Sequence, residues 1–226
     1  MSADALAWLG LLGLGAAHGL NPAMGWLFAV GIGLQERDGR AVWRALGPLA
    51  LGHALAIAAV LLLAAAAGLV IPGVWLRWIV AAALVGCGAF HLLRHRHPRF
   101  GGMRMSPREL TGWSFLVASA HGAGLMALPL VLSVGTQATS SPHVHAAVHA
   151  AGGHADHLLA AGIGSSQALG IIATLVHTLG YLAVTAVVAV VVYEKVGLGF
   201  LRRAWINVDL LWVVALVVTG LLTALL

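Results

Sequence analysis

The sequence predicts an all-helical membrane protein with six transmembrane helices, arranged as two inverted repeats of three helices. Hydrophobic residues make up 61% of the 226 residues and charged residues only 8%, whereas an ordinary soluble domain has about 25% charged residues. Apolar stretches of about 20 residues, the length that spans a bilayer, recur along the whole chain. No segment between them is long enough for a separate soluble domain. We therefore expect one membrane domain embedded in the lipid bilayer.

The expected spans follow one another with short connections. They cover residues 5–34, 46–70, 73–93, 112–135, 167–192 and 205–226. The second and third spans should form a tight hairpin at Ile71-Pro72-Gly73, because proline and glycine both interrupt helices. The first span has Asp4 and no basic residue before Arg37, so we interpret it as a retained helix and not as a cleaved signal.

Basic residues gather in the connections after the first, third and fifth spans. They are Arg37, Arg40, Arg44, Arg94, Arg96, Arg99, Arg104, Arg108, Lys195, Arg202 and Arg203. Only Arg77 lies near the other side. The positive-inside rule then places these connections in the cytoplasm and both termini outside a bacterial-type inner (plasma) membrane. The net charge of +5 thus indicates topology and not binding of nucleic acid.

Short motifs recur in the two halves of the chain, residues 1–111 and 112–226. Ala17-His18-Gly19-Leu20 in the first half matches Ala120-His121-Gly122-Ala123 in the second. A later span of each half carries a further histidine, His53 and His177. Two units of three spans must have opposite orientations in the membrane. That layout is typical of secondary transporters, whose substrate site lies near the midplane between the repeats.

These four histidines lie inside apolar spans, where ionisable groups are costly and usually face a cavity or another helix. Neutral imidazole is the commonest metal ligand and can also carry protons; the simpler interpretation is hydrogen bonding between helices. Pro22 has no amide hydrogen to donate, so it leaves a main-chain carbonyl near His18 free. For the methionines, the simpler interpretation is that they fill gaps in a core. The expected metal-binding residues are His18, Asn21, Met24, His53, His121, Met126 and His177.

The connection 136–166 differs from the others because it has no Lys or Arg. It would face outside, and its many small residues predict a mobile segment. Its histidines predict weak, fast capture of Ni, Co, Cu or Zn, while the alternative is a pH-sensitive or merely polar loop. The capture residues would be His143, His145, His149, His154, Asp156 and His157.

Two smaller features have simpler interpretations. His91 and His95 are four residues apart, and we interpret them as part of a basic helix end rather than as a metal site. Cys87 is the single cysteine, which excludes an internal disulfide and a CxxC redox pair. We expect it to be a packing residue.

The segment His18-Gly19-Leu20-Asn21-Pro22-Ala23-Met24 resembles the first-helix signature of the nickel/cobalt transporter group of the LysE-type superfamily. That group includes NicO- and RcnA-like proteins and UreH- and HupE-like permeases, and its pattern is roughly His-Ala-Leu-acid-Pro-Gly-His. Six short helices, a three-helix repeat and a His-rich loop fit the group as well. The resemblance implies transport of nickel or cobalt. However, Asn21 replaces the acid and Met24 the second histidine, and thioethers favour Cu(I), so copper stays open.

We therefore expect a transporter, and not an enzyme, whose substrate is a transition-metal ion and whose halves alternate in access. A second copy of the chain, or a periplasmic or cytoplasmic metal chaperone, would be a fitting protein partner. Two alternatives stay open. One is an integral membrane metalloenzyme with a His-ligated centre, although carboxylates that could bridge metals are nearly absent. The other is an exporter of a small organic or sulfur-containing solute, in which the histidines relay protons.

Overall fold

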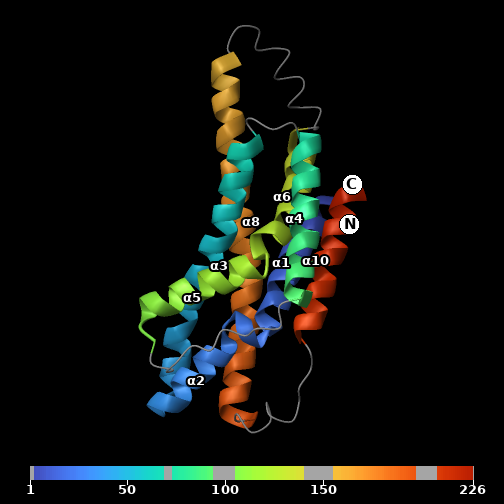
Figure 1. Cartoon of the computed structure of the whole chain (residues 1–226). Helices are drawn as coiled ribbons and strands as arrows, with labels where there is room; N and C mark the ends of the chain where they lie inside the picture. Colours follow the sequence, from blue (N-terminus) through green and yellow to red (C-terminus); the bar gives the residue numbers. More distant parts are fainter. Residues whose placement is uncertain (1–2, 69–72, 94–104, 140–154, 197–207, 226) are drawn as a thin grey trace.

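The computed structural model describes residues 3–68, 73–93, 105–139, 155–196 and 208–225. Within these ranges every regular element is helical (Figure 1), which confirms the predicted all-helical class. The α-helices are α1 (Ala3–Leu20), α2 (Trp26–Glu36), α3 (Gly39–Gly68), α4 (Gly73–Leu93), α5 (Pro107–Ala120), α6 (Ala123–Thr139), α8 (Ala155–Val191) and α10 (Val208–Leu225). A 3-10 turn, η1 (Pro22–Met24), and a π turn, η2 (Val192–Val196), complete them.

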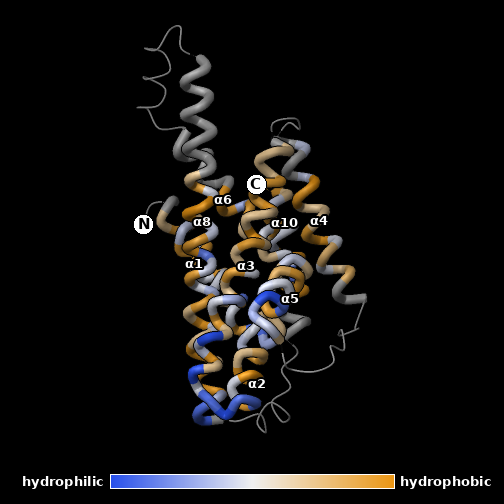
Figure 2. The backbone as a smooth tube through the Cα atoms, turned by 90° about the vertical axis from the view of Figure 1, so that its left-hand side faces the viewer, coloured by the Kyte–Doolittle hydropathy of each residue, from blue (hydrophilic) through white to orange (hydrophobic). Residues whose placement is uncertain are grey.

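Two helical stretches, Gly39–Ala67 and Ala168–Lys195, are long and apolar enough to cross a membrane. A third candidate is the bent pair Pro107–Ala120 and Ala123–Val131, whose axes differ by 63°. Shorter apolar helices cover Ala5–Leu20, Trp78–Phe90 and Val213–Leu225. Figure 2 shows that hydrophobic residues follow the tubes along most of their length, while hydrophilic residues gather at the α2 end of the molecule. The described chain thus has two, or at most three, candidate membrane-spanning helices by length and composition.

The first expected span, 5–34, is not one helix but is broken between α1 and α2. Pro22 begins the short turn η1, and the side-chain oxygen of Asn21 accepts a hydrogen bond from the Ala23 amide at 3.0 Å. Gly25 follows with φ of 146°, a conformation open only to glycine. The Trp26 indole then donates to the Leu20 carbonyl at 3.0 Å, which satisfies one of the acceptors left over at the end of α1.

The fourth expected span, 112–135, is also broken and begins earlier than predicted. Ser106 and Glu109 form a capping box that starts α5 at Pro107. The predicted boundary between the halves, at 111 and 112, therefore lies inside a helix. α5 ends at Ala120, and Gly122 adopts φ of 70° before α6 begins.

Helix ends elsewhere extend beyond the predicted ones. α3 begins at Gly39 and not near residue 46. α6 continues to Thr139 and α8 begins at Ala155, so residues 136–139 and 155–166 of the expected mobile connection are helical. Alanine has the highest helix propensity of all residues, and alanines recur in both of these segments.

The helices pack in three main pairs, α1 with α8, α3 with α5, and α4 with α10, and α3 and α8 also contact each other. Glycines allow the close approaches. A Cβ atom at Gly15 would overlap the His177 carbonyl, one at Gly180 the Leu12 carbonyl, and one at Gly52 the Thr111 carbonyl. Small residues at such crossings are typical of helix pairs in membranes. Gly15 and Gly180 bring the histidine-bearing segments of α1 and α8 together, and Gly52 brings the histidine-bearing segment of α3 against α5.

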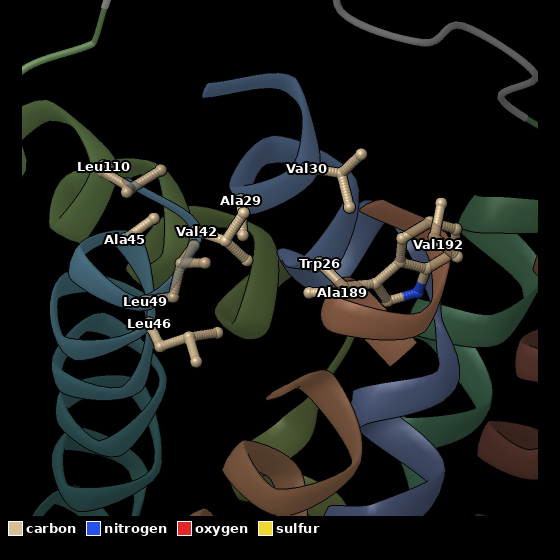
Figure 3. Packing of buried hydrophobic residues seen from close by; sticks show 10 residues of the cluster. All are labelled: Trp26, Ala29, Val30, Val42, Ala45, Leu46, Leu49, Leu110, Ala189 and Val192. Carbon is tan, nitrogen blue, oxygen red and sulfur yellow. The ribbon is translucent and has the colours of Figure 1, made fainter. Parts of the chain in front are cut away.

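An apolar cluster fixes the α2 end of the bundle (Figure 3). Side chains from α2, α3, α5, α8 and η2 meet there: Trp26, Ala29, Val30, Val42, Ala45, Leu46, Leu49, Leu110, Ala189 and Val192. Just outside it, Arg44 pairs with Glu36 at 2.6 Å across the turn between α2 and α3. Both partners are well exposed, so this ion pair adds little to stability, and the buried cluster anchors the returning helix.

Candidate functional site

Three imidazole rings meet in the interior, each from a different helix. His18 comes from α1, His53 from α3 and His177 from α8, and all three side chains have 0% exposure. The His18 ring centre lies 5.4 Å from that of His53 and 5.0 Å from that of His177. The His53 and His177 centres are 5.4 Å apart with nearly parallel rings. We refer to these three residues as the histidine cluster.

The main chain of α1 fixes the tautomer of His18. Its Nδ1 donates a hydrogen bond to the Leu14 carbonyl, one turn earlier, at 2.8 Å. A carbonyl oxygen can only accept, so Nδ1 carries the proton and a neutral ring has its lone pair on Nε2. Nε2 is the atom through which His18 can act as a metal ligand or accept a proton.

His53 and His177 are less well satisfied than His18. Neither ring nitrogen of His53 has a hydrogen-bond partner within the described part of the chain. The Leu11 carbonyl approaches the His177 ring, but neither nitrogen of that ring reaches hydrogen-bond geometry with a described residue. An unmet buried polar group costs roughly 1–3 kcal/mol. A ligand that contacted these nitrogens would recover that cost.

Tyr181 completes the cluster, and the sequence analysis missed it. Its ring is fully buried and stacks on His53, with centres 4.0 Å apart and planes within 8°. Its hydroxyl donates to the Met24 carbonyl at 2.7 Å, which ties α8 to the turn η1. Tyr181 lies four residues after His177, and residues at that spacing share a helix face. That spacing was the signal that could have identified it.

The break between α1 and α2 brings Met24 against this tyrosine, and Asn21 lies three residues earlier in the same break. Both side chains are 2% exposed. The oxygen of Asn21 caps η1, whereas its amide nitrogen has no hydrogen-bond partner among the described residues. Met24 belongs to a buried cluster that also contains Met126, Tyr181, Leu84 and Leu216. Cys87 packs against the same cluster and donates to the Ala120 carbonyl at 3.2 Å.

His121 occupies the corresponding place at the second break. Its Nδ1 donates to the Val117 carbonyl at 2.9 Å, which repeats the bond that His18 makes to Leu14. It lies near enough to His18 to interact with it electrostatically. Its side chain is only partly buried, unlike the three members of the histidine cluster.

The site is uncharged in its described surroundings. The buried polar side chains are His18, Asn21, His53, Ser114, Thr174, His177, Thr185 and Thr223, with no Asp or Glu among those described. The described residues also include no group of three or more His, Cys, Asp or Glu side chains arranged to hold a metal ion. In this arrangement the three rings therefore do not direct their nitrogens at one point, and an ion could bind only after the rings turn.

The expected capture residues lie at the edge of what the structure covers. His143, His145, His149 and His154 fall outside the described residues. Asp156 and His157 lie in the first turn of α8, where only the main chain is described. The prediction of metal capture on this segment therefore stays a prediction.

Comparison with protein-family models, with curated protein sequences and with solved structures finds no match for this chain. The resemblance to the nickel/cobalt transporter group therefore depends on the segment His18–Met24 and on the outline of the chain. The functional argument depends on the geometry of the site.

Proposed function

We propose that this chain is a membrane transporter whose substrate is a transition-metal ion, bound during transport by the histidine cluster. The observation that carries the proposal is the meeting of three completely buried imidazoles from three helices, at centre-to-centre distances of 5.0–5.4 Å. Nitrogen-to-metal bonds of about 2.0–2.1 Å in tetrahedral geometry put the centres of imidazoles on one ion about 5 Å apart. The ring positions therefore suit a shared ion once the rings turn.

The chemistry of the site favours a transient substrate site over a resident metal centre. Its donors are neutral, and no acid is buried among the described residues to hold a cation permanently. The ring nitrogens of His53 lack partners among the described residues, so this ring can turn toward an ion without breaking a described hydrogen bond. A carrier must release what it binds, and a site that forms only around its substrate suits that cycle better than a rigid enzyme centre does.

The proposed architecture is six spans in two inverted repeats, with both termini outside an inner (plasma) membrane and access alternating between the halves. Two features support it. Each half has a helix broken next to a histidine, at Asn21–Gly25 and at His121–Gly122. The broken helix of each half packs on the long helix of the other, α1 on α8 and α5 on α3. Broken helices of this kind surround the substrate sites of secondary transporters. Nickel or cobalt would be the substrate by resemblance, with copper open.

Flux measurements on purified protein in liposomes test the proposal. The segment 140–154 is deleted first, so that binding by its histidines cannot mask the interior site. Movement of Ni²⁺, Co²⁺, Zn²⁺ and Cu⁺ is then compared for this protein, its His53→Ala variant and a Thr223→Ala control. Thr223 is also buried and hydrogen-bonded, to the Thr219 carbonyl in α10, so it reports general damage. Flux that His53→Ala abolishes and Thr223→Ala preserves is the expected result. If no metal crosses under any condition, the proposal fails.

A further inference from the structure

We propose that the substrate is a soft monovalent cation, Cu(I) in the cell and Ag(I) as its laboratory equivalent, and that Met24 and Met126 bind it together with the histidine cluster. This inference rests on the proposed metal transport and specifies its substrate class. It departs from the nickel or cobalt that the resemblance implies.

One methionine lies at or next to each of the two helix breaks. Met24 ends the turn η1, immediately before Gly25. Met126 lies in the first turn of α6, where its amide donates to the Gly122 carbonyl at 2.9 Å. Both side chains are 2% exposed and belong to one packed cluster, although they come from opposite halves of the chain. Thioether sulfur selects Cu(I) among the biological metals.

Tyr181 connects the sulfur atoms with the imidazoles. Its ring stacks on His53 at 4.0 Å and it also belongs to the cluster that contains both methionines. Its hydroxyl bonds to the Met24 carbonyl at 2.7 Å. Tyr181 therefore belongs to the packed cluster of both methionines and also stacks on one ring of the histidine cluster.

The charge of the site points to the same class of ion. The desolvation cost of an ion grows with the square of its charge, so a divalent ion costs about four times as much to bury as a monovalent ion of equal size. Ni²⁺ or Co²⁺ would need carboxylates to offset that cost, and no buried acid occurs in the described interior. Neutral imidazole and thioether donors are sufficient for a single positive charge.

Leucine substitutions provide the test, since Met and Leu have similar volumes and exchanging them usually costs less than about 1.5 kcal/mol. The variants are Met24→Leu, Met126→Leu and the double variant, each with the segment 140–154 deleted. Met105→Leu is the matched control, because Met105 packs partly buried against the separate cluster at the α2 end. Liposome flux is measured for Ag⁺ in chloride-free buffer, for Cu⁺ kept reduced with ascorbate, and for Ni²⁺ and Co²⁺.

We expect Ag⁺ and Cu⁺ to cross at least about tenfold faster than Ni²⁺ or Co²⁺, and the double variant to lose about tenfold of that flux, equivalent to about 1.4 kcal/mol. Met105→Leu should stay within about twofold of the parent, below 0.5 kcal/mol on that scale. X-ray absorption of the Ag⁺-loaded parent should show both sulfur and nitrogen ligands.

Other outcomes separate the two proposals. Flux of Ni²⁺ or Co²⁺ that depends on His53 but is insensitive to both methionines would overturn the substrate class and leave metal transport standing. Ag⁺ flux that the double variant does not reduce would also overturn the methionine role. Absence of flux for every metal would overturn both proposals.

Discussion

The two helix breaks share one bond and differ in almost everything around it. At both, a histidine near the end of a helix donates Nδ1 to the carbonyl four residues earlier, from His18 to Leu14 and from His121 to Val117. The first break is spread over a 3-10 turn with a capping asparagine, and its histidine is completely buried. The second is a tight turn at Gly122 with a 63° bend, and its histidine is only partly buried.

This difference shows that similar motifs in the two halves do not have equal parts in the site. The first break contributes a ring to the histidine cluster, and its Met24 carbonyl receives the bond from Tyr181. The second break contributes Met126 and places His121 beside the cluster. Under the proposed function, His18 at the first break should therefore contribute more to binding than His121 at the second.

The largest effect on metal flux is expected when the histidine of each break is replaced by alanine in a separate variant. His18→Ala removes one of the three rings of the histidine cluster, so we expect metal flux to fall by roughly 100-fold, corresponding to about 2.7 kcal/mol. His121→Ala should lower it by less than about tenfold on the same scale. Liposome flux at saturating metal measures both. Equal losses in the two variants would show that the breaks are functionally equivalent and would contradict the comparison.

The next largest effect should come from introducing an acid at the first break. Asn21→Asp adds a negative charge beside the site, at a side chain whose amide nitrogen lacks a partner among the described residues. We expect the ratio of Ni²⁺ to Ag⁺ flux to rise by roughly tenfold, because a carboxylate offsets the charge of a divalent ion. The oxygen that caps η1 is retained in aspartate. A ratio that does not change would place Asn21 outside the substrate path.

The two glycines of the breaks provide a comparison of stability. Gly25 has φ of 146°, and a Cβ atom there would lie 2.8 Å from the Tyr181 hydroxyl. Gly25→Ala should therefore destabilise the protein by about 1–3 kcal/mol. Gly122 has φ of 70°, in the left-handed region, where alanine costs roughly 1–2 kcal/mol and the nearest contact is the flexible Leu216 side chain at 3.0 Å. In thermal unfolding in detergent, Gly25→Ala should have a lower midpoint temperature than Gly122→Ala, and the reverse order would contradict this account.

The smallest effect should follow Tyr181→Phe, which keeps the ring stacked on His53 and removes the hydroxyl. Loss of the bond from this hydroxyl to the Met24 carbonyl should cost about 0.5–1.5 kcal/mol, and the Ser114 and Thr185 side chains also interact with the hydroxyl. Thermal unfolding measures the loss. A loss of stability several times larger would mean that other contacts of the hydroxyl also stabilise the site.

The sequence predicted the helical class because apolar stretches of spanning length leave few alternatives. It also singled out His18, His53 and His177, because a histidine within an apolar stretch is conspicuous. It did not predict that the first and fourth expected spans are each interrupted, because hydropathy is continuous across Pro22 and Gly122. Only the local main-chain geometry ends the helices there. Tyr181 was missed because a tyrosine in a membrane helix is unremarkable until its neighbours in space are known.

The central claim is tested most directly by the metal content of the purified protein. The segment 140–154 is deleted, and the protein is dialysed against Ag⁺ or Ni²⁺ before the measurement. The histidine cluster predicts about one ion per chain in the parent and in Thr223→Ala. It also predicts loss of that ion when His18, His53 and His177 are all replaced by alanine. A parent that binds no ion, or a triple variant that binds as much as the parent, would contradict the claim that these three rings form the substrate site.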